Sequence, residues 1–355
     1  MSVDYEVLNK FLDVDSLELE YHRVTNNIST IDIEEGVEII FRYYRERGFP
    51  HYTVREDEKY THMKKLRKFD IDTIFIDNQI VQTMHCLRLA WNYFPHWVEI
   101  QCGSSKMPPI GYFNDDDKLK GIIRKTWTWQ LNYGRNRFTE NRFRQCLKLY
   151  EGSQGVSNFR PTAAKLIYEK FGGDGVIWDM SCGWGGRLLG FLASSNTKHY
   201  IGTEPSSKTY DGLLEMKKDF SYLGKQVDIY KLGSEVYVPE KESLDLCFTS
   251  PPYFDTEKYS DEDTQSYKKF PSEDKWVDGF LRKTIDNCYY GLKENGYMLI
   301  NIANTPKYKF IEEQTVKISK ELGFVQDDTV QLTLSSVMGA GYKYEPIFVF
   351  RKESE

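Results

Sequence analysis

Residues 175–195 read GVIWDMSCGWGGRLLGFLASS, an apolar run followed by a glycine-rich turn and a second apolar segment. The first run, GVIWDMS, predicts a short buried strand, and GGRLLGFLASS predicts a helix. Glycines between them permit a tight turn and a close approach of the backbone to a ligand, and N–H groups at the helix N-terminus point toward that ligand. The stretch therefore predicts a strand–turn–helix unit of an α/β fold, with a ligand at the turn.

The same alternation continues to the end of the chain. Expected strands at 199–205, 226–234, 243–253 and 297–304 are separated by expected helices at 207–224, 275–296 and 309–324. Strands separated by helices imply a doubly wound, mostly parallel, Rossmann-like sheet that binds ligands at its carboxyl edge. Two final strands, 330–336 and 345–352, follow each other without a helix, which predicts an antiparallel last strand inserted at the sheet edge.

The region before this sheet reads as mainly helical. The segment 33–49 is amphipathic and ends at Gly48 and Pro50, 56–70 is a second helix with a basic end, and a mostly apolar helix is expected near 80–95. The Gly- and Ser-containing stretch EGSQGVS at 151–157 reads as a short linker. We therefore expect two domains: 1–152, mainly helical and a candidate for nucleic-acid or target recognition, and 153–355, a catalytic α/β domain.

Composition favours a protein of the cytoplasm. The first residues are acidic and lack the basic-then-apolar layout of a signal peptide, and no apolar run is long enough to span a membrane. The six cysteines are scattered without a C-x-x-C pair, and the six histidines form no metal-binding pattern. We expect no disulfide framework, no metal and no membrane partner.

The formal net charge of −6 hides a basic, aromatic-rich stretch at 115–148. Trp127, Trp129, Tyr133, Phe138 and Phe143 are interleaved there with cations, and only Glu140 opposes them after the acidic triplet 115–117. Cations meet phosphates while rings stack on bases, so this mixture suits a nucleic-acid surface; a solvated helix pair with a buried aromatic face is the alternative. The candidate nucleic-acid contacts are Lys118, Arg124, Lys125, Arg135, Arg137, Arg142 and Arg144.

A second motif, FTSPPY at 248–253, follows the apolar run LDLC. The two prolines fix the backbone and remove two N–H groups, so the polar groups left in the turn are mostly acceptors. A hydroxyl at Ser250, stiff carbonyls and the ring of Tyr253 can hold a flat molecule that carries an exocyclic NH2 group. The alternative is a strand-ending turn with a packed tyrosine.

Two further positions fit a nucleoside-bearing cofactor. Glu204, about twenty residues after the glycine turn and at the end of the next expected strand, can accept hydrogen bonds from ribose hydroxyls. Gly233-Ser234-Glu235 ends the following strand and can meet an adenine ring. The spacing D-x-x-x-G-x-G is neither a dinucleotide fingerprint nor a phosphate-binding loop, which disfavours a nucleoside triphosphate.

The order DMSCGWGG, Glu204, TSPPY resembles the S-adenosylmethionine-dependent amino-methyltransferases, which modify adenine N6 or cytosine N4 in DNA. SNFRPT at 157–162 and YEPIFVFRK at 344–352 resemble that family's cofactor-contacting segment and closing strand. The resemblance covers roughly 156–352. Ser181 stands where the family usually has an apolar residue, two positions after the motif aspartate. No large target-recognition insert lies between the glycine turn and the proline turn or after the last strand, so recognition is expected from the N-terminal region.

The resemblance implies S-adenosyl-L-methionine as cofactor and DNA as partner. The residues it implies for cofactor binding are Asn158, Phe159, Arg160, Pro161, Asp179, Ser181, Gly183, Gly185, Glu204 and Ser234. The residues it implies for catalysis are Ser250, Pro251, Pro252 and Tyr253. The loop 254–271 is a candidate lid over the base.

The resemblance implies methyl transfer to an exocyclic base amine, with the base flipped out of the stack against Tyr253. The acceptors of the proline turn would bind the amine hydrogens and concentrate electron density on the nitrogen, so no cysteine nucleophile is required. RNA base methylation, a phage- or defence-type enzyme with another target and a catalytically silent nucleic-acid-binding subunit remain alternatives. Ser250 disfavours protein glutamine methylation, where Asn is usual.

Overall fold

A computed structural model describes residues 15–103, 105, 107–150, 155–337 and 341–354 of the chain. The chain divides into two compact units. A helical unit comprises the described parts of Met1–His51 and Trp97–Val156, and an α/β unit comprises Tyr52–His96 and the described part of Ser157–Glu355. Positions 151–154 of the expected linker lie outside the described residues.

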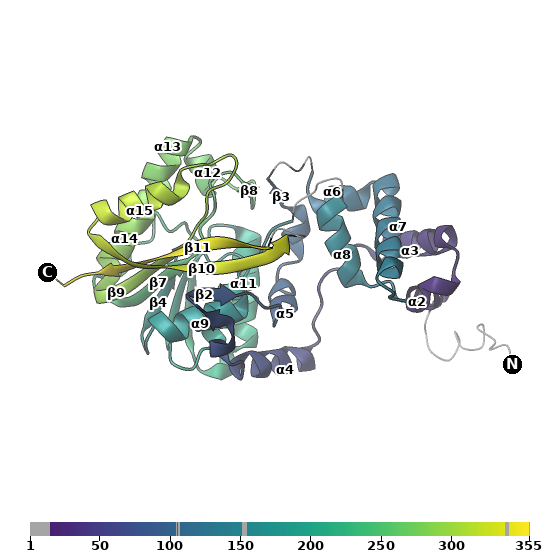
Figure 1. Cartoon of the computed structure of the whole chain (residues 1–355), viewed down its shortest axis with the longest axis horizontal. Coiled ribbons are helices and arrows are strands. Elements are labelled where there is room, and N and C mark those ends of the chain that lie inside the picture. The colour runs from purple at the N-terminus through teal and green to yellow at the C-terminus, as the bar shows by residue number, and fades with distance from the viewer. Residues whose placement is uncertain (1–14, 104, 106, 151–154, 338–340, 355) are drawn as a thin grey trace. The chain divides into compact units, whose positions relative to one another are not determined.

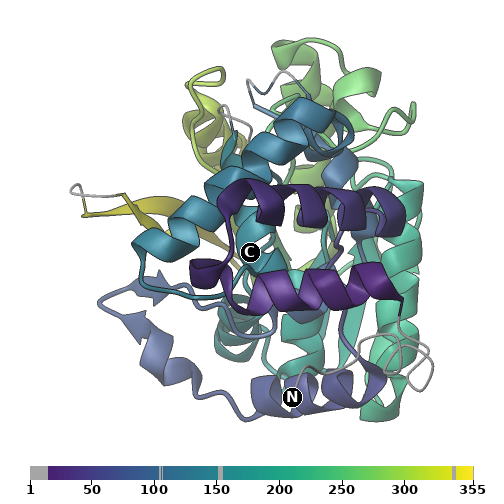
Figure 2. The same ribbon diagram turned by 90° about the vertical axis from the view of Figure 1, so that its right-hand side faces the viewer.

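The helical unit packs its helices around an aromatic core. Its elements are α2 (Ser16–Asn26), η1 (Ile28–Thr30), α3 (Ile33–Arg47), β3 (Gln101–Cys102), α6 (Pro109–Asn114), α7 (Asp116–Asn132) and α8 (Glu140–Leu149). Trp127 and Phe143 are fully buried in this core. A Cβ on Gly36 would lie 2.2 Å from the Trp127 ring, so α3 needs a glycine where it contacts α7. Figure 2 shows α2 and α3, in purple, running side by side.

The α/β unit is built on one nine-stranded sheet in the order β1-β2-β10-β11-β9-β7-β4-β5-β6. The strands are β1 (Phe75–Ile76), β2 (Gln79–Val81), β4 (Val176–Asp179), β5 (His199–Thr203), β6 (Gln226–Tyr230), β7 (Leu244–Thr249), β9 (Leu292–Asn301), β10 (Phe324–Val337) and β11 (Gly341–Lys352); a short β8 (Glu257–Lys258) lies outside this sheet. Strands β6, β5, β4, β7 and β9 are parallel. The predicted fold class, a mostly parallel Rossmann-like sheet with an antiparallel last strand, is confirmed (Figure 1).

The position of the antiparallel strand differs from the prediction. Strand β11 is antiparallel to both β9 and β10, and β10 pairs in parallel with β2. The antiparallel strand therefore lies inside the sheet, because the hairpin of β1 and β2 extends the sheet beyond β10.

Helices cover both faces of this sheet. The helical elements are α9 (Pro161–Phe171), α10 (Gly186–Ala193), α11 (Ser207–Asp219), η5 (Ser221–Leu223), α12 (Ser266–Lys269), α13 (Glu273–Trp276), the π-helical turn η6 (Val277–Arg282), α14 (Lys283–Gly291) and α15 (Ile311–Glu321). In β7, Phe248 contacts Tyr168 of α9, whereas its neighbour Cys247 joins the cluster that includes Ile285 of α14 and Ile318 of α15. Successive strand residues face opposite sides, so both faces of β7 are apolar, as expected for a central parallel strand.

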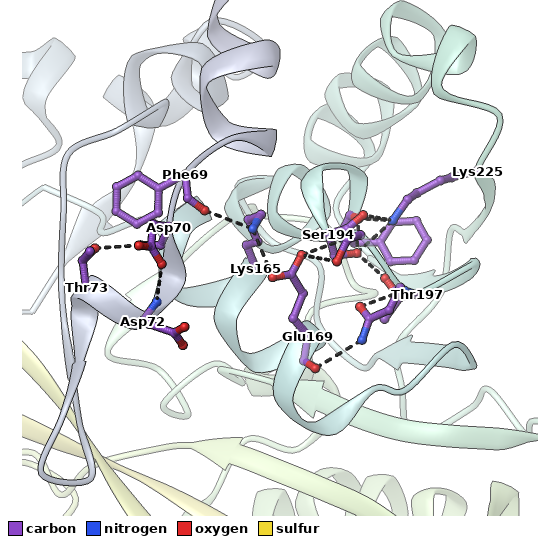
Figure 3. Close-up of polar contacts among 12 residues, drawn as sticks. Phe69, Asp70, Asp72, Thr73, Lys165, Glu169, Ser194, Thr197 and Lys225 are labelled. Atoms are coloured by element: carbon purple, nitrogen blue, oxygen red, sulfur yellow. Dashed lines mark hydrogen bonds and ion pairs between the residues drawn. The ribbon is translucent and has the colours of Figure 1, made fainter.

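Segment 52–96, predicted as part of the N-terminal domain, groups with the α/β unit. It contains α4 (Glu56–Arg67), η2 (Ile71–Ile74), β1, β2 and α5 (Leu87–Trp91), and η3 (Pro95–Glu99) begins at its end. The buried Lys165 of α9 donates to the carbonyl of Phe69 at 3.2 Å and to Glu169 at 3.0 Å (Figure 3). Lys59 of α4 bonds Asp219 of α11 at 2.7 Å. These long-range contacts fix the segment to the sheet's helices and cannot be read from local sequence.

The prediction of a helix near 80–95 is wrong. That stretch holds β2 and the five-residue α5 instead. Asp77 and Asn78 both adopt positive φ, at 49° and 61°, which closes the hairpin between β1 and β2. Ile80 of β2 and the apolar residues of α5 are buried, whereas Val81 and Met84 are exposed. Within the described residues, no helix combines the length and apolarity required to cross a bilayer.

Candidate functional site

A cavity of about 540 Å³ opens in the α/β unit and is lined by residues at the carboxyl ends of its parallel strands. Its volume lies in the range of small-ligand sites. The structure brings together here eleven of the fourteen residues predicted for cofactor binding and catalysis. They are Asn158, Phe159, Arg160, Ser181, Gly183, Glu204, Ser234, Ser250, Pro251, Pro252 and Tyr253.

The glycine turn and Glu204 form one wall of this cavity. Gly183 adopts φ 55°, which a side chain would strain, and its N–H donates to Glu204 Oε2 at 3.0 Å. The N–H of Ser206 donates to Glu204 Oε1 at 2.9 Å. Burial raises the pKa of Glu204 to about 7, against the two N–H bonds that lower it. Each carboxylate oxygen has a second acceptor site left for a ligand hydroxyl.

Asp179 does not line the cavity, although it was predicted to contact the cofactor. Its fully buried carboxylate accepts from Arg187 Nε at 2.8 Å and Tyr200 at 2.7 Å through Oδ2. Its Oδ1 accepts from Thr249 Oγ1 at 3.0 Å and from the N–H of Ser181 at 3.3 Å. Asp179 therefore holds the glycine turn and the end of β7 in fixed register, and the ligand-facing atoms belong to the residues it supports.

The segment before α9 fits closely against the glycine turn. Asn158 Nδ2 donates to the carbonyl of Trp184 at 2.8 Å. A Cβ on Gly186 would lie 1.9 Å from the carbonyl oxygen of Phe159. The two segments can approach this closely only because position 186 is glycine.

Arg160 is a cavity-lining cation. Its Nε donates to Gln82 Oε1 at 3.0 Å, and burial lowers the pKa of Arg160. Among the described residues no carboxylate pairs with this guanidinium within 4 Å, so its charge is available to an anionic group of a ligand. Pro161 starts α9, and Gly185 caps α10 at φ 70°; neither lines the cavity.

The proline turn forms the opposite part of the cavity. Strand β7 ends at Thr249, and Ser250, Pro251 and Pro252 follow without regular structure, as predicted. Burial and, after it, the nearby Glu345 raise the pKa of Tyr253 and keep its phenol neutral, whereas the Ser250 side chain and the backbone of Ala303 lower that pKa. The turn thus presents a hydroxyl, carbonyl oxygens and a ring to one cavity.

Several lining residues were missed from the sequence, notably Gln82, Trp184, Asn301 and Glu345. The motif YEPIFVFRK contained Glu345, but nothing local distinguished a carboxylate in the cavity from a solvated one. Gln82 was not among the predicted site residues because its segment was expected to form a helix away from the strand ends.

The cavity also contains buried polar atoms without a protein partner. Trp184 Nε1, Gln265 Nε2 and Glu235 Oε2 all belong to lining residues and are unbonded within the part of the chain that the structure describes. Native proteins rarely leave such atoms unsatisfied, so they are suited to bonding a bound molecule. Donors and an acceptor in one apolar-walled cavity fit a nucleoside.

The segment predicted as a lid, 254–271, supplies Tyr259, Gln265 and further lining residues. Glu262 accepts from the N–H of Ser207 at 3.1 Å, at the start of α11. Lys269 bonds Glu235 at 2.7 Å. The segment is thus fixed to the side of the cavity that carries Glu204 and Glu235.

The predicted basic surface is smaller in the structure than in the sequence. Arg144 is buried and donates to the carbonyl of Pro50 at 2.6 Å. Lys118 bonds Asp115 at 2.7 Å in the first turn of α7, and Arg124 makes two bonds to Glu34 of α3. The acidic residues of α3, distant in sequence, neutralise part of the cluster, so Glu140 is not its only opposing charge.

The predicted cations that remain are Lys125, Arg135, Arg137 and Arg142, and the rings near the end of α7 are the partly buried Trp129 and the exposed Tyr133. Arg142 lies 3.7 Å over the Trp129 ring, Trp129 contacts Tyr133, and Tyr133 is 62% exposed. We call this set the Tyr133 surface, and it comprises Lys125, Trp129, Tyr133, Arg135, Arg137 and Arg142. Lys125, Arg135 and Arg137 are exposed.

Neither the cysteines nor a metal site adds to this chemistry. All six cysteines are buried and free. Among the described residues no group of three or more His, Cys, Asp or Glu side chains is placed to hold a metal ion.

Comparison with known families gives one match, over residues 244–355, to the DNA methylase family of N6/N4 amino-methyltransferases. The matched part contains the proline turn, the lid segment and β11. The match supports the resemblance inferred from the motifs and, with it, a methyltransferase that uses S-adenosylmethionine. No curated protein matches the sequence.

Solved structures resemble the chain in part. The N-methyltransferase NodS from Bradyrhizobium japonicum aligns with 55% of this chain and 94% of its own at 12% identity, with a TM-score of 0.40. A TehB-like SAM-dependent methyltransferase from Corynebacterium glutamicum aligns with 64% of this chain and 99% of its own at 16% identity, with a TM-score of 0.37.

Proposed function

We propose that the chain is an S-adenosylmethionine-dependent methyltransferase that methylates the exocyclic amine of a DNA base, adenine N6 or cytosine N4. The supporting observation is that the glycine turn, Glu204 and the proline turn, distant in sequence, line one cavity. The match to DNA methylases over residues 244–355 agrees with this proposal.

The cofactor would lie against the first half of the cavity. Glu204 would accept hydrogen bonds from the ribose, and Ser234, Glu235 and Gln265 would meet the adenine ring, where two polar atoms lack a partner. Arg160 would balance the cofactor's carboxylate. The bound sulfonium supplies the methyl group and a good leaving group; the protein's own part is positioning and electrostatics.

The base amine would lie at the proline turn. The Ser250 hydroxyl and the Pro251 carbonyl are acceptors that can bind an amine hydrogen, and such a bond concentrates electron density on the nitrogen. The ring of Tyr253 would stack on the base, which in duplex DNA must first flip out of the helix.

Incubation with isotopically labelled cofactor and DNA or RNA pools, followed by mass spectrometry of the nucleosides, tests the proposal. N4-methylcytosine or N6-methyladenine from DNA is the expected product. Methylated RNA alone would favour the RNA alternative, and binding of nucleic acid without any transfer would favour a silent subunit.

Glu204 predicts a pH dependence of cofactor affinity. Bonds from ribose hydroxyls favour its carboxylate form, and its pKa of about 7 means that the proton must leave when the cofactor binds below that pH. The wild-type Kd, measured by calorimetry, should be about tenfold weaker at pH 6 than at pH 8. The variant Glu204→Gln should bind more weakly and lose most of this dependence; an equal slope in both proteins would contradict the assignment.

The Tyr133 surface predicts salt-dependent binding of nucleic acid. The double variant Arg135→Ala/Arg137→Ala should lower the slope of log affinity against log salt by about 1–2, because each phosphate contact contributes about one counterion. A matched control is Arg23→Ala/Arg42→Ala, which removes equal charge from cations already paired with Glu35 and Glu20 in the same unit. Equal loss in both variants would indicate a general charge effect and contradict a specific surface.

A further inference from the structure

Glu345 places a carboxyl group in the cavity beside the proline turn. It belongs to β11, whose residue Ile347 pairs with Asn301 of β9, and both Glu345 and Asn301 line the cavity with Tyr253. Glu345 is half-buried. Asn301 Nδ2 donates to the carbonyl of Pro346, the next residue, at 3.1 Å. Burial and, after it, the charge of Glu345 raise the pKa of the Tyr253 hydroxyl. Glu345 therefore lines the same cavity as the turn assigned to the target base.

Burial and a neighbouring charge favour the neutral form of Glu345. Burial raises the pKa of Glu345 most, the Asn301 side chain lowers it, and repulsion from Glu312 of α15 raises it further. Tyr253 faces it from the turn, and Glu257 of β8 acts on the same phenol. Among the described residues no lysine, arginine or histidine forms an ion pair with Glu345.

A neutral carboxyl group has one donor, its O–H, beside one acceptor, its C=O. Adenine (N1 with N6) and cytosine (N3 with N4) present the complementary edge, a ring-nitrogen acceptor beside an NH2 donor. Guanine presents two donors, N1–H and N2–H2, to the same group, and thymine and uracil have no amine. The carboxyl group can thus distinguish bases by their Watson–Crick edge.

We propose that Glu345 reads the edge of the flipped base, donating its O–H to the ring nitrogen and accepting one amine hydrogen, and so restricts the site to adenine and cytosine. The proline turn would accept the other amine hydrogen. This inference rests on the proposed function and adds a specificity-determining residue from β11, outside the proline turn.

The variants Glu345→Gln and Glu345→Ala separate this reading role from a proton-accepting role. Glutamine keeps one donor and one acceptor at the same place, whereas alanine keeps neither. The substrate is an oligonucleotide that carries the unmethylated target base, and the cofactor is saturating. Under these conditions we expect the alanine variant to lose about 30-fold or more in single-turnover rate, since two hydrogen bonds are lost. The glutamine variant should remain at least tenfold faster than the alanine variant. The wild-type rate should fall as pH rises and Glu345 loses its proton, and the rate of the glutamine variant should not.

A substrate lacking the ring nitrogen tests the contact from the other side. An oligonucleotide with 1-deazaadenine, or 3-deazacytosine where cytosine is the target, should slow wild type by about tenfold and slow Glu345→Ala by less than threefold. Glu353→Gln, an exposed carboxylate just after β11, is the control and should behave as wild type.

The outcomes separate the two proposals. If wild type transfers no methyl group to nucleic acid, the proposed function fails. If wild type is active but Glu345→Gln is as slow as Glu345→Ala, the carboxylate form is needed and the edge-reading role is overturned. Equal loss from the deaza base in wild type and Glu345→Ala would overturn it as well.

Discussion

Tyr253→Ala should lower the single-turnover rate of methyl transfer by about 100-fold or more, the usual cost of losing a group that positions the reacting atoms. Tyr253 lines the cavity beside Ser250, so it offers a ring next to the hydroxyl that would accept an amine hydrogen. Cofactor affinity should stay within about threefold, because the cofactor contacts lie at the glycine turn and Glu204.

Two further variants separate the contribution of the Tyr253 ring to this rate from those of the two hydroxyl groups. Tyr253→Phe keeps the ring and removes the phenol hydroxyl, whereas Ser250→Ala keeps the ring and removes the acceptor. Each should cost about tenfold at most, near one hydrogen bond. Tyr290→Ala, an exposed tyrosine of α14, is the matched control. Rates of Tyr253→Ala within about threefold of wild type, with cofactor bound, would exclude the turn from the reaction.

The order of elements in the α/β unit could be predicted because its strands are apolar on both faces and its turns carry glycine or proline. The pattern places β4, β5 and β7 correctly, whereas β9 begins at Leu292, inside the helix expected at 275–296. It fails for segment 52–96, whose hairpin depends on Asp77 and Asn78 at positive φ and on pairing between β2 and β10. Such pairing joins residues about 250 positions apart, and neither partner signals it locally.

Site residues could be predicted where glycine or proline at the end of a strand marks their position. They could be predicted less well where contacts between residues distant in sequence decide their role. Gly183, Glu204 and Ser250 follow directly from strand ends. Asp179 follows from the same motif, yet its role changes from ligand contact to support, because its partners Arg187 and Tyr200 come from other elements. The basic cluster shrinks for the same reason, since α3 supplies carboxylates that a linear count of charges misses.

The second large effect concerns the buried pair of Asp179 and Arg187. Both side chains are almost fully buried, at 0% and 6% exposed, and are joined at 2.8 Å. Arg187→Met should lower the free energy of unfolding of the α/β unit by about 3–5 kcal/mol, because it leaves an uncompensated buried carboxylate. Hydrogen exchange of the amides of β4 and β5 measures this unit separately from the helical one.

A second variant identifies the cause of that loss. Asp179→Asn/Arg187→Met, which removes the buried charge, should recover part of the loss. Lys198→Met, from the exposed pair with Asp174, should cost about 1 kcal/mol or less. If Arg187→Met costs no more than Lys198→Met, the pair does not hold the two turns together, and the joint placement of Ser181 and Thr249 must come from the sheet alone.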